Sequence, residues 1–232
     1  MNLLLAIDCS AGACSVAVAE DAEVRAHEAL RLARGHAEVL MPMVERVLAE
    51  ADCTAQEIGV VAATVGPGSF TGMRIGLAAA RGLALAVGAR TVPVTSLEAI
   101  AHAAGLAAAQ AADPPKTPLL VALDSKRGDL YAQWFEAGGQ AMGDPDVLTA
   151  PAAVAGSVAM PGVAGFRVAG DMMGDLVEAA AAAGLEAVPV EGCDVPDARS
   201  VAAVALGRLA AGGAGPLRPL YLRAPAVNLP VA

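Results

Sequence analysis

The sequence predicts an α/β fold of two related lobes, in which mixed sheets are flanked by helices. The first observation is that short apolar runs alternate with longer helical patterns. The second is an internal repeat. Residues 4–8 read Leu-Leu-Ala-Ile-Asp and precede Gly12, and residues 120–124 read Leu-Val-Ala-Leu-Asp and precede Gly128. The offset is 116 residues, half of the 232-residue chain, which favours duplication over a chance match in an Ala-, Val- and Leu-rich sequence.

The first lobe is expected to span residues 1–106. Turn residues separate its first three apolar runs, which favours an antiparallel meander before a helix. Thr54 and Glu57 form a capping-box pattern, Gly88 ends a long apolar helix, and Ser96 is the expected N-cap of the next helix. The predicted strands are 2–8, 15–19, 23–30, 58–64 and 91–94, and the predicted helices are 37–51, 71–87 and 96–104.

The second lobe is expected to span residues 107–232, with its last helix or its tail returning to the first lobe. It opens with an Ala-, Pro- and Asp-containing linker at 107–118, and its tail is proline-rich and extended from Pro219 onward. Glycine-rich loops separate its elements. The predicted strands are 119–124, 130–135, 167–169 and 187–190, and the predicted helices are 176–183 and 199–211.

Composition limits the classes of function. The net charge is −9 and the lysines are Lys116 and Lys126, so we expect any RNA contact to depend on another subunit. Arg74 and Arg81 interrupt the longest apolar run, and the N-terminus lacks a basic start, which favours a cytoplasmic protein that crosses no membrane. The four cysteines form no C-x-x-C pair and the three histidines form no H-x-x-x-H pair. We therefore expect no metal and no cofactor.

The most informative stretch is the glycine-rich segment from Gly66 to Gly76. Five residues separate Gly66 from Gly72, and methionine follows where a phosphate-binding P-loop needs lysine. Pro67 and Thr71 stand two positions before and after Ser69, where a nucleophile elbow needs glycine. Two interpretations stay open: a tight strand–helix connection, or a helix N-terminus that meets an anion or another chain.

The repeated aspartates, Asp8 and Asp124, are the candidate metal-ligating residues. Duplicated halves of this form resemble the actin-like, sugar-kinase and heat-shock ATPase superfold, whose lobes each present such a hairpin to a nucleotide between them. That arrangement would let the two carboxylates share a hydrated Mg²⁺. The alternative is that each aspartate caps its own hairpin. Only a degraded glycine loop, from Val168 to Gly174, matches the adenosine loop of that superfold.

The two long helices of the first lobe are apolar over more than one face. Helix 37–51 has an apolar arc of about 200°, whereas one core-facing stripe needs little more than 100°. Glycine and alanine recur every four residues from Gly72 to Ala84, which would let another helix approach closely. The helices are either buried on both sides within the chain or shared with a partner. The candidate partner-interface residues are His36, Leu40, Met41, Val44, Phe70, Met73, Arg74, Gly76, Leu77 and Arg81.

These motifs together resemble the TsaB (YeaZ) family over nearly the whole chain. The segments that carry the resemblance are 6–8 with 13–16, 36–38 with Met41-Pro42, the loop 66–76, the hairpin 122–131 and the stretch 219–223. The second half departs from the family in its alanine tracts, and the tail lacks the basic residues often seen there. The resemblance therefore does not carry the family's partner contacts over to the tail of this chain.

The resemblance implies an actin-like subunit without a working active site. Such a subunit would bind the catalytic TsaD subunit and, with the TsaE ATPase, support transfer of threonylcarbamoyl to the adenosine beside the anticodon of ANN-decoding tRNAs. It would meet tRNA only through the complex and form a homodimer when alone. One alternative is a stand-alone small ATPase or kinase of the same superfold. A weaker one is a peptidase, after the family's old label as a glycoprotease homologue.

Overall fold

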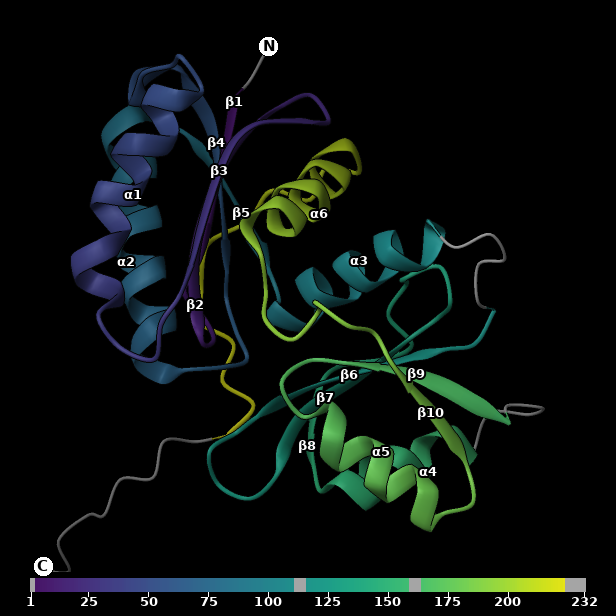
Figure 1. Cartoon of the computed structure of the whole chain (residues 1–232). Coiled ribbons are helices and arrows are strands. Elements are labelled where there is room, and N and C mark those ends of the chain that lie inside the picture. The colour runs from purple at the N-terminus through teal and green to yellow at the C-terminus, as the bar shows by residue number, and fades with distance from the viewer. Residues whose placement is uncertain (1–2, 111–115, 159–163, 224–232) are drawn as a thin grey trace, which may run out of the picture.

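The computed structural model describes residues 3–110, 116–158 and 164–223, which form two five-stranded sheets (Figure 1). The first sheet has the order β3-β2-β1-β4-β5 and the second the order β8-β7-β6-β9-β10. The first sheet comprises β1 (Leu3–Asp8), β2 (Ala13–Glu20), β3 (Glu23–Arg31), β4 (Ile58–Thr64) and β5 (Arg90–Val94). The second comprises β6 (Leu119–Asp124), β7 (Leu130–Phe135), β8 (Asp146–Leu148), β9 (Gly165–Ala169) and β10 (Glu186–Pro189).

The two sheets repeat one topology. In each, the first strand pairs antiparallel with the second and parallel with the fourth: β1 with β2 and β4, and β6 with β7 and β9. The repeated aspartates occupy equivalent places, because Asp8 opposes Ser15 and Asp124 opposes Leu130 at the end of each hairpin. The predicted fold of two related lobes with mixed sheets is therefore confirmed.

Helices cover both sheets. They are α1 (His36–Glu50), α2 (Phe70–Val87), α3 (Ser96–Ala109), α4 (Ala150–Val158), α5 (Met173–Ala182) and α6 (Ala198–Ala210), with a short 3₁₀ helix η1 at Ala55–Glu57. In Figure 1, α1 and α2 lie on one face of the first sheet and α6 on the other. Helices α4 and α5 cover the outer face of the second sheet, and α3 lies between the lobes. Helix α3 contributes Leu97, Ile100 and Ala104 to the core beneath the second sheet.

Local capping explains both ends of α2 and the start of α3. Ser69 Oγ accepts a hydrogen bond from Gly72 N at the start of α2, and Gly88 ends that helix with a φ of 70°. Thr95, not Ser96, caps α3, because Thr95 Oγ1 accepts from Glu98 N while Glu98 bonds back to Thr95 N. This helix continues to Ala109, five residues beyond its predicted end. The sequence did not predict β8 or α4 at all.

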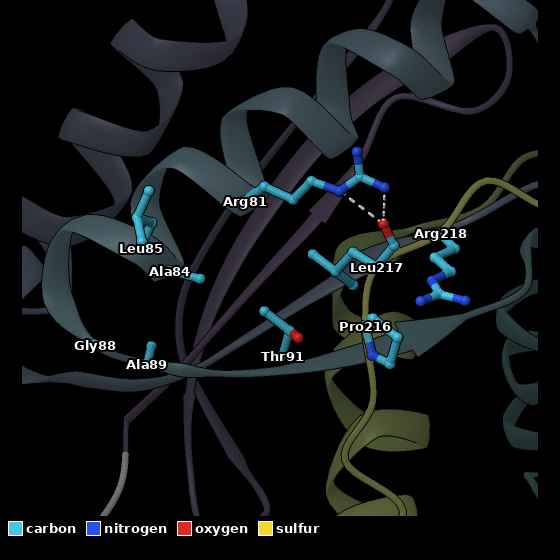
Figure 2. A pocket seen from close by; sticks show the side chains of 9 residues that line it. All are labelled: Arg81, Ala84, Leu85, Gly88, Ala89, Thr91, Pro216, Leu217 and Arg218. Carbon is cyan, nitrogen blue, oxygen red and sulfur yellow. Dashed lines mark hydrogen bonds between the residues drawn. The ribbon is translucent and has the colours of Figure 1, made fainter.

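The last helix and the following segment return to the first sheet. At the start of α6, Ala198 N donates to Ser15 Oγ at 2.9 Å, and Asp197 lies 3.2 Å from His27 Nε2. Beyond α6, Gly215 N donates to Thr91 O. The segment then passes beside α2, where the Arg81 guanidinium donates to the Leu217 carbonyl (Figure 2).

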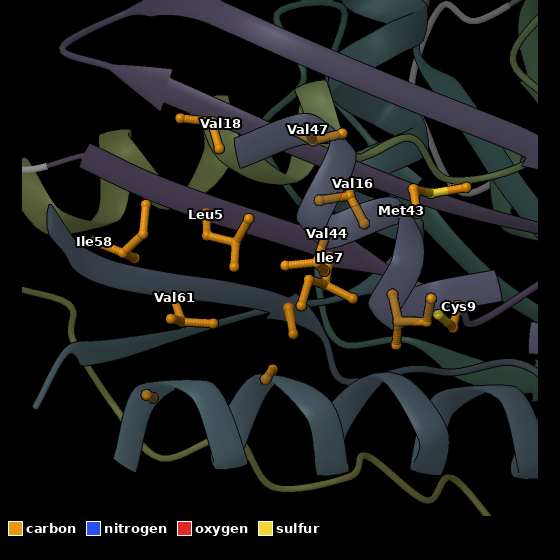
Figure 3. Close-up of a cluster of buried hydrophobic side chains, with 14 of the residues drawn as sticks. Leu5, Ile7, Cys9, Val16, Val18, Met43, Val44, Val47, Ile58 and Val61 are labelled. Atoms are coloured by element: carbon orange, nitrogen blue, oxygen red, sulfur yellow. The ribbon is translucent and has the colours of Figure 1, made fainter. Parts of the chain in front are cut away.

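The side chains of β1 point alternately to the two faces of the first sheet, and so the core of the first lobe has two layers. Leu5 and Ile7 face α1 and α2, where they pack with Val44, Val47 and Val61 (Figure 3). Leu4 and Ala6 face the opposite way and pack beneath α6. Because successive strand side chains point to opposite faces and both faces of β1 are buried, its residues are apolar apart from the terminal Asp8.

Helix α2 is long and apolar enough to cross a membrane, with 18 residues and a mean hydropathy of 1.3. Arg74 and Arg81 interrupt the apolar run of this helix, although its average hydropathy stays high. In the structure the helix packs on the first sheet, and Met73, Leu77 and Ala80 are buried there. This packing buries 33% of the 18 residues, and the outer face of the helix stays open.

Candidate functional site

The glycine loop between β4 and α2 packs directly on the turn between β1 and β2. A Cβ atom at Gly68 would overlap the Ser10 carbonyl, and one at Gly72 would overlap the Cys9 carbonyl. Ser69 N also donates to Ser10 O at 2.7 Å. Glycine is needed here because it lets two backbone segments approach closely. These contacts support the interpretation of the loop as a tight strand–helix connection.

Beneath this loop lies a buried polar cluster around Asp8. The Asp8 carboxylate is fully buried, and its Oδ1 accepts from Ser10 N, Ser10 Oγ and Thr64 Oγ1 at 3.0, 2.6 and 2.6 Å. Ser96 Oγ donates to Ser10 Oγ at 2.8 Å and links α3 to the cluster. Burial raises the pKa of Asp8 to about 6, although the hydrogen bonds from Ser10 and Thr64 oppose the shift. Sequence patterns single out Asp8 alone, because Thr64 comes from β4 and Ser96, which joins the cluster through Ser10, comes from α3.

Asp124, the counterpart of Asp8 in the second lobe, has a more open environment. Its carboxylate accepts from Lys126 N at 2.6 Å and from Lys126 Nζ at 2.8 Å, and these contacts lower its pKa. Its backbone N donates to Asp171 Oδ1 at 2.8 Å. Each repeated aspartate therefore accepts from the backbone N–H two residues later, as in a capped turn.

The two aspartates do not fit a shared hydrated Mg²⁺. Asp8 is enclosed beneath the glycine loop, and its Oδ1 already accepts three hydrogen bonds, whereas Mg²⁺ sites retain several waters. Within residues 3–110, 116–158 and 164–223, no three His, Cys, Asp or Glu side chains are arranged to hold a metal. Cys9 and Cys14 lie close together, with 3.4 Å between their Sγ atoms, and both are free thiols in the core.

The histidines of the described chain take part in structural contacts. His36 is buried at the start of α1, and its Nε2 lies 3.3 Å from the Ala11 carbonyl. His102 Nδ1 lies 3.2 Å from the Oγ of Ser200, and burial lowers the pKa of this histidine. Ser200 is itself buried on α6, so this serine is closed to a peptide substrate.

The ten partner-interface candidates divide into two groups. Six lie in the chain's own interior: His36, Leu40, Val44, Met73, Gly76 and Leu77. Gly76, for example, faces Cys9, where an added Cβ would lie 3.3 Å from the Cys9 Cβ. Gly72 and Gly76 thus let α2 pack closely on Cys9, which follows β1. The other four candidates are exposed: Met41, Phe70, Arg74 and Arg81.

Two of the exposed candidates form a stack with the C-terminal segment. The Arg74 guanidinium lies 3.6 Å from the centroid of the Phe70 ring, and Arg74 Nε donates to Tyr221 Oη at 3.0 Å. The Phe70 and Tyr221 rings are 5.9 Å apart and inclined by 32°. Because 147 residues separate Arg74 from Tyr221, no local sequence pattern indicates this contact.

The fourth exposed candidate, Arg81, lies at a cavity of about 550 Å³ between α2 and the C-terminal segment (Figure 2). Its guanidinium bonds the Leu217 carbonyl, and Arg218 and Leu85 also line the cavity. Leu85 is 86% exposed, the largest value among the exposed large apolar side chains of the described residues. It was not among the predicted interface residues, although its position four residues after Arg81 places both on one helix face.

Comparison of sequences relates this chain to proteins of tRNA modification. The family model "TsaD: tRNA N6-adenosine threonylcarbamoyltransferase" matches residues 29–170, more than half of the chain. The tRNA threonylcarbamoyladenosine biosynthesis protein TsaB of Escherichia coli is 37% identical over 133 residues, which cover 57% of this chain and 54% of that protein. The TsaB protein of Haemophilus influenzae is 38% identical over 44% of this chain and 42% of that protein. The chain thus spans about half the length of the curated relatives it matches.

Solved structures extend the likeness to nearly the whole chain. YeaZ from Pseudomonas aeruginosa has a TM-score of 0.78 and 26% identity, covering 96% of this chain and all of that one. An uncharacterized protein with similarity to peptidase YeaZ, also from Pseudomonas aeruginosa, has a TM-score of 0.80 and 28% identity over the same shares. Component A of the Acidaminococcus fermentans (R)-2-hydroxyglutaryl-CoA dehydratase, at 12% identity and a TM-score of 0.51, covers 90% of this chain and all of that one, and shares the fold alone. The chain therefore belongs to the family that the TsaD model describes, and its TsaB and YeaZ relatives confirm the resemblance to the TsaB (YeaZ) family.

Proposed function

We propose that this chain is a non-catalytic subunit of the machinery that adds threonylcarbamoyl to the adenosine beside the anticodon of tRNA. It acts by binding and stabilising the catalytic TsaD subunit, in a complex that also includes the TsaE ATPase. Support comes from the family, from relatives named for threonylcarbamoyladenosine biosynthesis, and from a likeness to YeaZ structures over 96% of the chain. The proposed site of action is the cytoplasm, where tRNA is modified.

The enclosure of Asp8 is the observation that favours this role over a stand-alone ATPase or kinase. In that superfold the aspartate at the end of the first strand faces a nucleotide. Here the side chain is fully buried, and the glycine loop packs on the turn that follows it. A nucleotide phosphate or a hydrated cation would need the loop to move away. The buried position of Ser200 beside His102 likewise gives no support to a peptidase.

The outer face of α1 and the part of the outer face of α2 around Arg81 and Leu85 are the proposed surface for TsaD. Met41 on α1 is 41% exposed, and Leu85 on α2 is 86% exposed beside the cavity that Arg81 lines. Both helices lie on the same side of the first sheet (Figure 1). Exposed large apolar side chains on one surface are typical of a protein interface. We further propose that two copies of the chain use this surface to form a homodimer when TsaD is missing.

Depletion of the protein from its native cell tests the role in modification. The content of threonylcarbamoyladenosine in bulk tRNA, measured by mass spectrometry, should fall towards zero and recover when the wild-type gene is restored. An unchanged content would overturn the assignment. The test does not depend on which surface contacts TsaD.

Co-purification tests the proposed surface. Leu85→Asp should weaken the complex with tagged TsaD strongly, since a carboxylate would lose its water on an apolar interface. Val188→Asp is the matched control, because Val188 on β10 is 49% exposed in the other lobe. If both variants retain TsaD equally, the proposed surface is not the interface.

A further inference from the structure

The stack of Phe70, Arg74 and Tyr221 is ordered by its own contacts and still open to solvent. Arg74 is held over the Phe70 ring and bonded to the Tyr221 hydroxyl. The Phe70 and Tyr221 residues nevertheless remain 48% and 43% exposed. In the described part of the chain, Arg74 takes part in no ion pair, so its charge is not neutralised by a carboxylate. A cation over an aromatic ring is attracted by the quadrupole of the ring, and this attraction holds Arg74 against Phe70.

The hairpin between β6 and β7 lies next to this stack. Arg223, two residues after Tyr221, pairs with Asp129 of the hairpin, and Asp129 also accepts from Ser125. The hairpin tip carries Lys126, whose side chain is 77% exposed, and Arg127, which is exposed and forms no ion pair among the described residues. The stack, the hairpin from Asp124 to Asp129, and the adjoining Arg223 and Asp171 are together named the aromatic–basic patch.

The charge of this patch opposes that of the whole chain. Its cations are Arg74, Lys126, Arg127 and Arg223, and its carboxylates are Asp124, Asp129 and Asp171, so the balance is four against three, or +1. The chain as a whole carries −9. Lys126 and Arg223 engage two of these carboxylates, which leaves Arg74 and Arg127 against the single carboxylate of Asp171. A local positive surplus on an acidic protein favours an anionic partner.

Open aromatic faces next to unneutralised guanidinium groups match the chemistry of unpaired nucleotides. Bases stack on aromatic rings, while arginine and lysine meet the phosphates that join them. We propose that the aromatic–basic patch binds a short unpaired stretch of RNA while the chain is part of its tRNA-modifying complex. This inference rests on the proposed function and adds to it a contact between this subunit and the RNA. Phe70 and Arg74 are thereby assigned to RNA, and Met41, Arg81 and Leu85 remain the proposed protein interface.

Fluorescence anisotropy with the purified complex of this chain and TsaD tests the proposal. The probe is a short labelled oligouridylate, compared with an RNA hairpin of equal length whose bases are paired. The complex should bind the unpaired RNA more tightly. Tyr221→Leu should weaken that binding by roughly 5- to 150-fold, because one stacked base is lost. Arg127→Ala should lower the slope of log affinity against log salt by about 0.7, as expected for one phosphate contact.

Arg90→Ala is the matched control, because Arg90 is exposed at the start of β5 and lies outside the patch. Its affinity for the oligouridylate should equal that of the wild type. Equal weakening by Arg90→Ala and Arg127→Ala would reduce the effect to overall charge and overturn the proposal. If the Tyr221→Leu variant no longer binds TsaD, the stack belongs to the protein interface, and the proposal is likewise overturned. The modification content after depletion is a separate measurement, so the proposed function can stand if the RNA contact fails.

Discussion

At the end of β1, the Asp8 carboxylate is surrounded by hydroxyl groups that other elements supply. Thr64 comes from β4, Ser10 from the following turn and Ser96 from the start of α3. Oδ1 accepts all the hydrogen bonds, and Oδ2 is buried without a partner among the described residues. Because an ionised carboxylate loses its hydration on burial, the protonated form is favoured in the folded state. Asp8 therefore couples the stability of the first lobe to pH.

The sign of this coupling follows from the pKa of Asp8, which is about 6 in the folded state against a model value of 3.8. Its contribution to stability is fully present below about pH 4 and is lost as the pH rises through 6. Asp8→Asn should remove that dependence. The difference in free energy of unfolding between wild type and variant should change by on the order of 3 kcal/mol between pH 4 and 7.

Urea unfolding at several pH values measures this difference. Asp144→Asn, in the exposed loop before β8, is the control and should give a curve parallel to the wild type. Both the wild type and the variant contain carboxylates such as Asp197, whose pKa is lowered. Their opposing contribution therefore cancels in the difference between the two free energies of unfolding. Burial of Asp197 is outweighed there by hydrogen bonds from His27 and Arg199. A parallel curve for Asp8→Asn would contradict the raised pKa.

At the scale of one element, α2 shows how two faces of an apolar helix differ. Its inner face carries Gly72 and Gly76, which let the helix approach Cys9 at the end of β1. Its outer face carries Arg74, Arg81, Gly82 and Leu85. Both faces contain glycine, but only the inner glycines have neighbours that an added methyl group would meet. The two faces should therefore respond in opposite ways to the same substitution.

Gly72→Ala should destabilise the protein by about 1–3 kcal/mol, since its Cβ would overlap the Cys9 carbonyl and the helix would have to shift. Gly82→Ala should leave the stability unchanged or raise it by up to about 1 kcal/mol. No atom lies within 4 Å of its added Cβ, and alanine favours the helix. Thermal or urea unfolding of the two variants decides the point. Equal losses would mean that the outer face of α2 is packed as tightly as the inner one.

Across the whole molecule, the segment after α6 joins the two lobes. Gly215 and Leu220 donate backbone hydrogen bonds to Thr91 and Val65 of the first lobe. Leu217 is 2% exposed and belongs to the core beneath α2. Arg223 then pairs with Asp129 of the second lobe. A segment that the sequence predicts as an extended tail is thus part of the fold.

Leu217→Ala should cost about 2–5 kcal/mol in unfolding free energy, because a buried leucine leaves a cavity when it is shortened. Leu85→Ala, which alters the same residue type at the same cavity, should change stability by less than about 0.5 kcal/mol, because Leu85 is exposed. Calorimetry of both variants at one pH tests the pair. A neutral Leu217→Ala would mean that the segment adds nothing to the stability of the first lobe.

Much of the fold could be predicted from local patterns. The apolar runs ending at Thr64 and Asp124 became β4 and β6 with the predicted limits, and Gly88 ended α2 as expected. Helix α4 escaped prediction because residues 150–158 have little polar periodicity and include Pro151 and Gly156. The three-residue strand β8 is defined by pairing with β7 rather than by its own composition. Neither element has a local sequence pattern from which it could be predicted.

The sequence by itself determined the duplicated lobes, most strands and helix ends, the lack of a P-loop pattern and the family resemblance. These follow from periodicity, caps and turns, which act between residues close together in the chain. Only the tertiary structure decided which face of α2 is buried, that Asp8 is enclosed, and that Tyr221 reaches Arg74 across 147 residues. Burial and pairing of this kind depend on contacts between distant segments. A helix with an apolar arc of about 200° can bury more than one face, so its sequence does not specify which face is buried.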